Sequence, residues 1–354
     1  MLSVCVFLQF VHFASGSALI SNVIPRRSTD NAIMDAHSGP IRRWKTPGDA
    51  TYWWYASSYN NCTEPPKNVS GCTPWPPPPN GCGFRTDHYV TLFTSSDLGT
   101  WTNRGAALRM TDMHAQGLVE SILYSPIVVY NAVNDVYVMW FNYVLTDFSA
   151  SYIAIATSKT RAGPFTLAVK NVTLAHAATG DFSILLDDDG VSAYIIYTAH
   201  IFGPGPAHLM SVEALSPDFM SSTGANSGYF GHTGVEGPSL FKRNGIYYAS
   251  FGGTCCFCAE GSDAYIYTSG SPLGPYTLQS KLGGGSPIGA QQSAIFPWVD
   301  SSGTEQWMWW GARWQTAPDG DKAHDYNFFF PLSFTPDGNI STMTWVDEFF
   351  VDAE

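Results

Sequence analysis

Short apolar segments alternate with polar turns along nearly the whole chain, and they follow two recurring patterns. In the first, an apolar strand is joined by a polar turn to an aromatic strand, as in "SPIVVYNAVNDVYVMWFNY" from Ser125 and "PSLFKRNGIYYASFGG" from Pro238. In the second, an alternating strand leads into Thr-Ser and a Gly or Pro turn, as in "AYIYTSGSPLGPYTL" from Ala264. Turns such as Asn-Asp and Asn-Gly are typical of β-hairpins. The two patterns together predict antiparallel sheets of about four strands.

The first pattern occurs five times. The residues just before its five openings are separated by 87, 57, 55 and 56 positions, and they are His37, Tyr124, Asp181, Glu236 and Gln292. A near-constant period of this size, with about four strands in each unit, is typical of a β-propeller. We therefore predict an all-β fold, a five-bladed β-propeller formed by a single domain over residues 30–352.

The long first interval indicates an insertion in blade one, over about residues 60–87. It contains "PWPPPPNGCG" and the cysteines Cys62, Cys72 and Cys82. A segment so rich in Pro and Gly does not form a ladder strand, so we expect a disulfide-rich surface loop near one mouth of the propeller. A second cysteine group lies at 255–258. Disulfides are the favoured interpretation and zinc the alternative for that second group, and sequence leaves the pairing open.

Composition narrows the fold and the partners. Only 13% of residues are charged and 15% are aromatic, which favours a core of Trp, Tyr and Phe over amphipathic helices. The net charge is -12 and the most basic segment is the short "RRWK" from Arg42. Nothing in this distribution would neutralise a phosphate backbone, so nucleic acid is excluded as an expected partner.

The N-terminus predicts export. The segment "MLSVCVFLQFVHFASGSA" resembles a secretory signal peptide over residues 1–18, although it lacks Lys and Arg before its apolar part. Sequons at Asn61, Asn68, Asn171 and Asn339 suit a secreted glycoprotein. No apolar run reaches the roughly 18 residues of a membrane-spanning helix, so we expect an extracellular protein without a membrane span.

Polar residues gather where each blade begins. The innermost strand of a propeller blade lines the central axis, so the residues just before it converge from distant parts of the chain. The five openings carry His37 with Asp35 nearby, Tyr124 with Glu120 nearby, Asp181, Glu236 and Gln292. This row of polar residues ahead of apolar strands predicts a site at one end of the axis.

Five motifs, four of them at these openings, resemble those of glycoside hydrolase family 43, and most closely those of its exo-β-1,3-galactanase-like branch. They are "AHSGPI", "GDFSILLDDDG", "EGPSLFKRNGIYY", "QSAIF" and "GARW", and the resemblance extends over about residues 32–348. It implies a secreted, inverting exo-glycosidase that hydrolyses β-linked galactan side chains or a related polysaccharide. It implies no cofactor and no catalytic metal, and it leaves room for a structural cation in the central channel. We expect a monomer.

The resemblance assigns the proton donor. Glu236 matches the general acid of the family, and Asp181 matches the carboxylate that raises the pKa of the acid and orients it. This pairing is physically reasonable, because burial and a neighbouring negative charge both favour the protonated form of a glutamic acid. Inversion further requires a group on the opposite face of the sugar that activates a water molecule.

The identity of that group stays open in the sequence. The common family pattern has an Asp at the first blade opening, whereas this chain has Ala36-His37, as the galactanase-like branch does. In that branch a glutamine in blade five replaces the base, and Gln292 matches it. Since an amide is a poor proton acceptor, Gln292 would position water. Asp35 is the alternative base, because it lies two residues before His37 and hence on the same strand face.

The expected substrate-binding residues are His37, Trp54, Glu120, Tyr124, Arg313 and Trp314. Instead of binding substrate, the tryptophans could pack between blades, and Arg313 could form a structural ion pair. Three polar residues of the branch are replaced here, by Ser57, Tyr124 and Ala312, which leaves galactose specificity open. An arabinofuranosidase or xylosidase, or a catalytically inactive carbohydrate-binding propeller, are the alternative functions.

Overall fold

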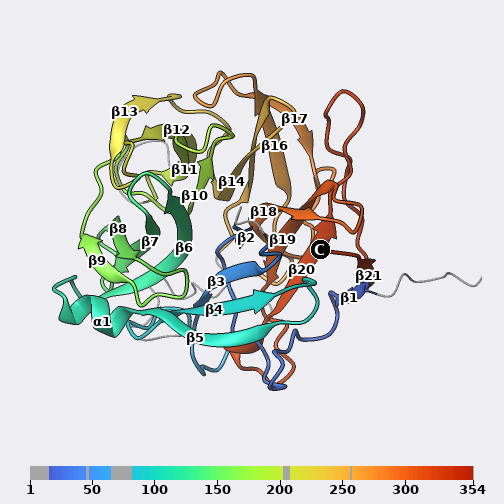
Figure 1. Cartoon of the computed structure of the whole chain (residues 1–354), viewed down its shortest axis with the longest axis horizontal. Helices are drawn as coiled ribbons and strands as arrows, with labels where there is room; N and C mark the ends of the chain where they lie inside the picture. Colours follow the sequence, from blue (N-terminus) through green and yellow to red (C-terminus); the bar gives the residue numbers. More distant parts are fainter. Residues whose placement is uncertain (1–15, 45–47, 65–81, 202–207, 256, 354) are drawn as a thin grey trace, which may run out of the picture.

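The chain folds into five antiparallel β-sheets arranged around a common axis (Figure 1). The computed structural model describes residues 16–44, 48–64, 82–201, 208–255 and 257–353. Most of the predicted signal peptide, the sequon at Asn68 and the cysteines Cys72 and Cys256 lie outside the described residues. Within them the prediction of an all-β, five-bladed propeller is confirmed.

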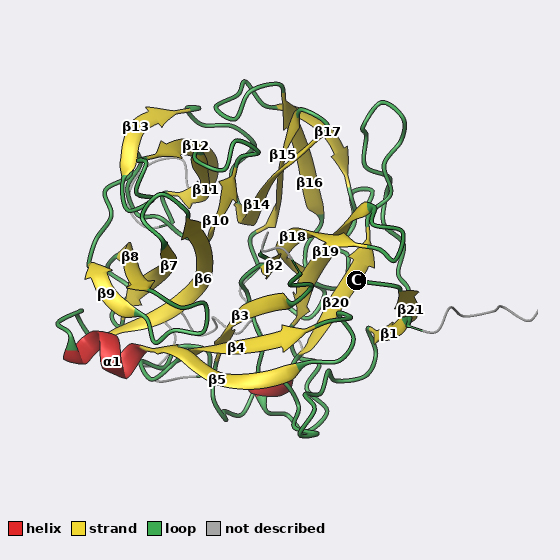
Figure 2. Ribbon diagram, viewed as in Figure 1, coloured by secondary structure: helices red, strands yellow, loops and turns green. Residues whose placement is uncertain are grey.

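Each sheet is a meander whose strands run outward from the axis in chain order (Figure 2). Blade one contains β2 (Ile41–Arg43), β3 (Tyr52–Ser58), β4 (Tyr89–Ser95) and β5 (Thr102–Arg109). Blade two contains β6 (Ser121–Asn131), β7 (Val136–Leu145), β8 (Ser151–Ser158) and β9 (Thr166–Val169). Blade three contains β10 (Phe182–Leu186), β11 (Ala193–Ala199), β12 (Leu209–Leu215) and β13 (Ser222–Asn226).

Blade four contains β14 (Val235–Arg243), β15 (Ile246–Gly253), β16 (Ala264–Ser269) and β17 (Thr277–Lys281). Blade five contains β18 (Gln291–Val299), β19 (Glu305–Arg313) and β20 (Tyr326–Pro331). In the described part of the chain this last sheet therefore has three strands, one fewer than the repeat predicts. A short helix α1 (Met110–Ala115) follows β5, and a 3-10 turn η1 (Lys322–His324) precedes β20. None of the helices in the described ranges has the length and hydropathy of a membrane span.

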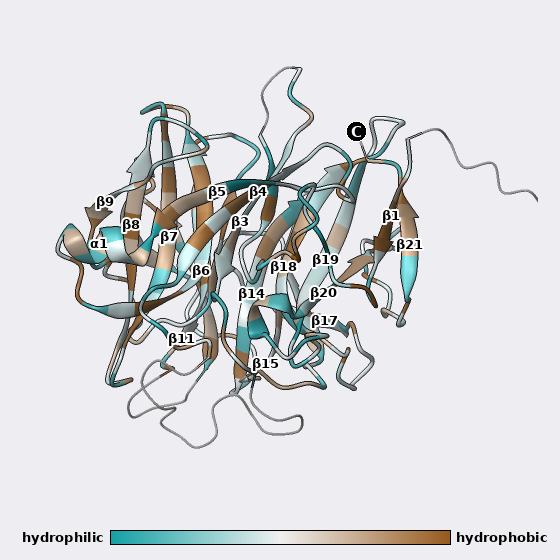
Figure 3. Ribbon diagram, turned by 90° about the horizontal axis from the view of Figure 1, so that it is seen from below, coloured by the Kyte–Doolittle hydropathy of each residue, from teal (hydrophilic) through white to brown (hydrophobic). Residues whose placement is uncertain are grey.

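Large aromatic side chains fill the spaces between neighbouring blades. Trp54 of blade one meets Trp310 of blade five edge to face at 5.0 Å, and Trp140 of blade two packs against Phe182 of blade three at 6.4 Å. Many residues of the strands are hydrophobic, as the brown segments of Figure 3 show. Each fully buried side chain of this kind contributes about 1.5–3 kcal/mol. The high aromatic content of the chain thus serves the packing between blades.

The two ends of the chain close the ring together. Strand β1 (Ala18–Ser21) pairs antiparallel with β21 (Glu348–Val351) at the outer edge of the molecule (Figures 1 and 3). The buried amide of Asn22 donates to Phe329 O at 3.0 Å and accepts from Phe329 N at 2.8 Å, which ties this pair to β20. Residues 18–21 are therefore part of the propeller.

The blade-one insertion is fastened to blade five. Its described ends carry the Cys62–Cys82 disulfide, and Cys62 N donates to Asp321 Oδ1 at 3.1 Å. The prediction of a disulfide within this insertion is confirmed. In the second cysteine group, Cys255 and Cys258 form a disulfide, which removes them as ligands for zinc.

Candidate active site

Glu236 lies at the start of β14, where the local backbone holds its side chain toward the axis. The pairing of β14 with β15 shifts register between Glu236 and Ser239. Gly237 makes this shift sterically feasible: its φ is +62°, and a Cβ atom there would lie 2.5 Å from Gln292 O. The Gly-Pro dipeptide after Glu236 thus permits close approach between blades four and five.

Two donors fix one oxygen of this carboxyl group. Cys255 N and Gln291 Nε2 both donate to Glu236 Oε1, each at 2.6 Å. Among the described residues, Oε2 accepts no hydrogen bond, which leaves it for a ligand. Both donors come from sheets near the axis, so the position of the acid is set jointly by the loop after β15 and by β18.

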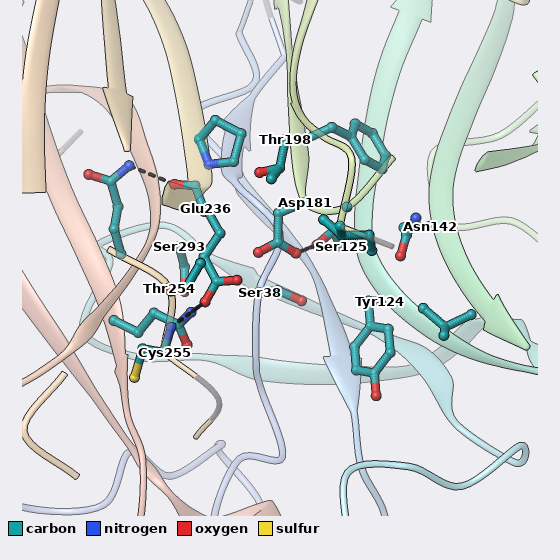
Figure 4. A pocket seen from close by; sticks show the side chains of 18 of the residues that line it. Ser38, Tyr124, Ser125, Asn142, Asp181, Thr198, Glu236, Thr254, Cys255 and Ser293 are labelled. Carbon is teal, nitrogen blue, oxygen red and sulfur yellow. Dashed lines mark hydrogen bonds between the residues drawn. The ribbon is translucent and has the colours of Figure 1, made fainter. Parts of the chain in front are cut away.

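Asp181 faces the same space from blade three (Figure 4). Its Oδ1 accepts from Ser125 Oγ at 2.6 Å, and its carboxylate also accepts from the backbone of Gly237. Burial raises the pKa of Asp181, while these two donors favour its ionised form. Gly237 therefore links the two carboxyl groups directly.

Burial, and then the negative charge of Asp181, raise the pKa of Glu236 to about 8. The hydrogen bonds from Cys255 and Gln291 oppose this shift. Near neutral pH Glu236 thus carries a proton, and Asp181, whose two donors favour its ionised form, is the neighbouring carboxyl group. This is the state required of a general acid and its modulator.

The two carboxyl groups lie in a cavity of about 630 Å³. All five blades contribute to its floor through residues at or next to their openings, namely Ser38, Ser125, Asp181, Glu236 and Gln292. Among the described lining residues, Asp181 and Glu236 are the only carboxylates. Of the five predicted opening residues, Tyr124, Asp181, Glu236 and Gln292 line this cavity, and in blade one Ser38 does so in place of His37.

The comparisons with known proteins identify the family. The model for Glycosyl hydrolases family 43 matches residues 49–338. The chain belongs to this family. A curated relative, the β-D-galactofuranosidase of Aspergillus niger, is 26% identical over 252 residues, which is 67% of this chain and 67% of that protein.

Two solved structures resemble this family 43 hydrolase in fold. The exo-β-1,3-galactanase of Clostridium thermocellum is 23% identical with a TM-score of 0.73, over 94% of this chain and 67% of that one. The exo-β-1,3-galactanase of Phanerochaete chrysosporium, solved with β-1,3-galactotriose, is 20% identical with a TM-score of 0.73, over 95% and 71%. At these identities the likeness shows the shared propeller.

Gln292 of the hydrolase lines the cavity, but its amide is committed to the protein. Its Nε2 donates to Gly237 O at 2.7 Å, and its Oε1 accepts from Trp309 Nε1 at 2.9 Å and from Ser250 Oγ. Only 3% of its surface is exposed. Gln292 therefore ties blade four to blade five, while one N–H of its amide makes no hydrogen bond to the described residues and its role in positioning water stays a prediction.

Gln291 is a residue of the cavity that the sequence analysis did not single out. It connects Glu236 to the wall of the cavity, because its Oε1 accepts from Trp314 Nε1 at 2.6 Å while its Nε2 holds Glu236. The signal was present in the doubled glutamine "QQ". Both glutamines line the cavity, and sequence alone does not say that Gln291 holds Glu236 while Gln292 bonds to Gly237 O.

Asp35 and His37 lie behind the cavity and do not line it. The Asp35 carboxylate accepts from Tyr59 N and Asn60 N, both at 3.0 Å, so it organises the turn after β3. His37 is fully buried, with its ring stacked on Tyr59 at 4.6 Å and on Trp314 at 5.4 Å. Asp35 as base and His37 as a sugar contact are therefore not brought to the pocket.

The other predicted binding residues divide into two groups. Tyr124 and Trp314 line the cavity, and the Tyr124 hydroxyl donates to Gly83 O at 2.8 Å. Three residues lie elsewhere. Trp54 is fully buried in the interface of blades one and five. Arg313 donates to Asn22 O and packs over the Trp345 ring. Glu120 is exposed, and its carboxylate accepts a hydrogen bond from Thr86.

No group of three or more His, Cys, Asp and Glu side chains arranged to hold a metal ion is found among the described residues. The structural cation considered from the sequence stays a prediction.

Proposed function

We propose that this family 43 hydrolase is a secreted, inverting exo-glycosidase that removes β-linked galactose from the ends of galactan chains. The observation that carries the proposal is the pair of carboxyl groups in this cavity, where Cys255 N and Gln291 Nε2 hold Glu236 and Asp181 faces the same space. Burial and then Asp181 raise the pKa of Glu236 to about 8, which favours its acid form near neutral pH. A cavity with a floor made by all five blades suits the end of a sugar chain and not its middle. Its volume is typical of small-ligand sites.

In the proposed reaction, Glu236 donates its proton to the glycosidic oxygen as the bond to the anomeric carbon breaks. Asp181 keeps that proton available at neutral pH and stabilises the positive charge that develops on the sugar. A water molecule attacks from the opposite face. Because the described pocket offers no third carboxylate, we assign the orientation of this water to neutral groups on the floor, with the Ser38 and Ser293 hydroxyls as candidates.

Release of a furanose sugar is the second candidate function. It is favoured by the Aspergillus niger relative, a β-D-galactofuranosidase, which is 26% identical over 67% of this chain. Tyr124 also replaces the acidic residue that the galactanase-like branch has at this opening, so one expected polar contact with galactose is absent.

The test is a product screen with anomeric detection. We expect purified protein to release galactose from β-1,3-galactan oligomers, with the α-anomer appearing first in a proton NMR time course. Arabinan, xylan and a galactofuranoside are incubated in parallel to test the second candidate. Release of the β-anomer would overturn inversion. Binding of oligomers without hydrolysis, in both the wild type and Glu236→Gln, would establish a carbohydrate-binding propeller instead.

Secretion is also part of the proposal. The disulfides Cys62–Cys82 and Cys255–Cys258 are typical of an oxidising compartment. Of the sequon asparagines, Asn61, Asn171 and Asn339 are all exposed, as attached glycans would require. Expression with the native N-terminus in a eukaryotic host should place the protein in the medium. Treatment with an N-glycosidase should then lower its mass, and retention in the cytosol would contradict the proposal.

A further inference from the structure

The cavity has two chemically different parts. The floor is polar and is built at the blade openings, whereas one side consists of aromatic rings. We call this side the aromatic wall and define it as Phe84, Phe148, Phe257 and Trp314, all of which line the cavity. Successive rings meet edge to face: Phe148 lies 5.7 Å from Phe84, Phe84 lies 5.5 Å from Phe257, and Phe257 lies 4.9 Å from Trp314.

The aromatic wall comes from segments outside the blade strands. Phe84 follows the Cys62–Cys82 disulfide in the blade-one insertion, and Phe148 lies in the turn after β7. Phe257 lies inside the loop closed by Cys255 and Cys258, and Trp314 directly follows β19. Four separate segments thus deliver one ring each to the same side of the pocket.

The aromatic wall begins at the proton donor. Cys255 N holds Glu236 Oε1 from two residues before Phe257, and Gln291 joins the same oxygen to the Trp314 indole. A general acid donates its proton to the oxygen of the leaving group. The leaving group must therefore lie on the Glu236 side of the cavity, next to these rings.

A buried cation supports the aromatic wall from within the protein. The Lys322 ammonium lies 3.8 Å from the centre of the Phe257 ring and 3.9 Å from that of Trp314, and Lys322 is 1% exposed. The Asp325 carboxylate, 3.4 Å away, balances its charge. A desolvated cation at a ring face holds the ring firmly, so Phe257 and Trp314 are ordered before a ligand arrives.

We propose that the aromatic wall is the leaving-group subsite, and that it binds a ring with an apolar face, either the C–H face of the second sugar or an aryl aglycone. This rests on the proposed glycosidase function. Rings offer contact area and few hydrogen bonds, so the subsite selects for a flat apolar surface and not for particular hydroxyl groups. Aryl glycosides are then accepted along with disaccharides, and small alkyl glycosides are poor substrates.

The experiment compares substrates that differ only in the leaving group. Wild type, Phe84→Ala and Phe148→Ala are assayed with the β-1,3-linked disaccharide, the 4-nitrophenyl β-glycoside and the β-glycosyl fluoride of the sugar that the wild type releases. Hydrolysis of the fluoride breaks the C–F bond, forms a C–O bond to water and releases fluoride with a proton. Its leaving atom is too small to touch the aromatic wall. Phe350→Ala, on the exposed outer strand β21, is the matched control.

We expect kcat/KM to fall roughly 3- to 10-fold per ring on the disaccharide and the aryl glycoside, which corresponds to one aromatic contact. Turnover of the fluoride should stay within twofold of the wild type, as should all activities of the control. An equal fall on all three substrates would show that the rings only maintain structure. No fall on any substrate would also overturn the subsite. A wild type that hydrolyses none of them would instead refute the proposed function.

Discussion

Gln291 Nε2 donates to Glu236 Oε1 at 2.6 Å, while Gln291 Oε1 accepts from the Trp314 indole at the same distance. One amide thus couples the proposed proton donor of blade four to an aromatic residue of blade five. The bond favours the ionised form of Glu236 and so opposes the shift that makes it an acid. It is therefore an orienting contact, since burial and Asp181 outweigh its effect on the pKa.

Replacement of Glu236 by Gln should remove the proton donor without changing the shape of the site. We expect kcat to fall roughly 10²- to 10⁴-fold on a galactan disaccharide. The loss should be smaller on a β-galactosyl fluoride, whose leaving group needs less help from an acid. Asp188→Asn, in the exposed hairpin between β10 and β11, is the control and should match the wild type. Equal losses on both substrates would argue against general-acid catalysis by this residue.

The pH dependence should follow the proton on Glu236. Activity should decline as pH rises through about 8, because the acid form is then lost. Asp181→Asn removes the negative charge that raises this pKa, so the alkaline limb of kcat/KM should move to lower pH. Profiles of kcat/KM from pH 5 to 9.5 for both proteins measure the shift. An unchanged limb would show that Asp181 does not act on the ionisation of Glu236.

The same pKa predicts a stability effect. The pKa of Glu236 is raised in the folded state from an ordinary value of 4.5 to about 8, so folding favours its protonated form. Its contribution is fully present below pH 4.5 and is lost as pH rises toward 8, on the order of 1 kcal/mol per pH unit. Glu236→Gln, which cannot ionise, should therefore gain stability relative to the wild type between pH 5 and 8 in urea unfolding. A constant difference over this range would contradict the assignment.

Gln291 and Gln292 should differ in what their loss affects. Gln291→Ala leaves Glu236 with one donor fewer, so kcat should fall and the alkaline limb should move to higher pH. Gln292→Ala leaves Gly237 O, Ser250 and Trp309 without partners, and it should cost about 1–3 kcal/mol of unfolding free energy. Measurements of kcat and of urea unfolding for both variants test this difference. A loss of stability in Gln291→Ala together with a loss of kcat at unchanged stability in Gln292→Ala would contradict it.

Trp54 should behave as a core residue. Trp54→Ala creates a cavity between blades one and five and should cost about 3–5 kcal/mol of unfolding free energy. KM of the folded fraction should stay close to that of the wild type, because the side chain does not reach the pocket. Trp314→Ala, which removes a lining residue, is the comparison and should raise KM. A raised KM for Trp54→Ala at unchanged unfolding free energy would instead indicate that Trp54 binds substrate.

The sequence determined the period, the number of blades and the positions of the two carboxyl groups in the cavity. These follow from it because each repeat must bury both faces of its strands, and a repeat of constant length places each opening at an equivalent point around the axis. Asp181 and Glu236 occupy two such openings, and the resemblance to the family singled them out among the five. The aromatic composition likewise indicated blade interfaces before any contact was known.

Tertiary structure decided which neighbours of those openings reach the cavity. Asp35 and His37 do lie close together, with 3.4 Å between Asp35 Oδ1 and His37 Nε2, as strand alternation predicts. Both nevertheless lie behind Tyr59 and Trp314, because long-range ring stacking sets the depth of each side chain. Which of the two glutamines holds Glu236 depended on the hydrogen bonds of the assembled chain. The aromatic wall depended on loops that disulfides and Lys322 bring together. Neither feature has a repeating pattern, so only the assembled propeller could show them.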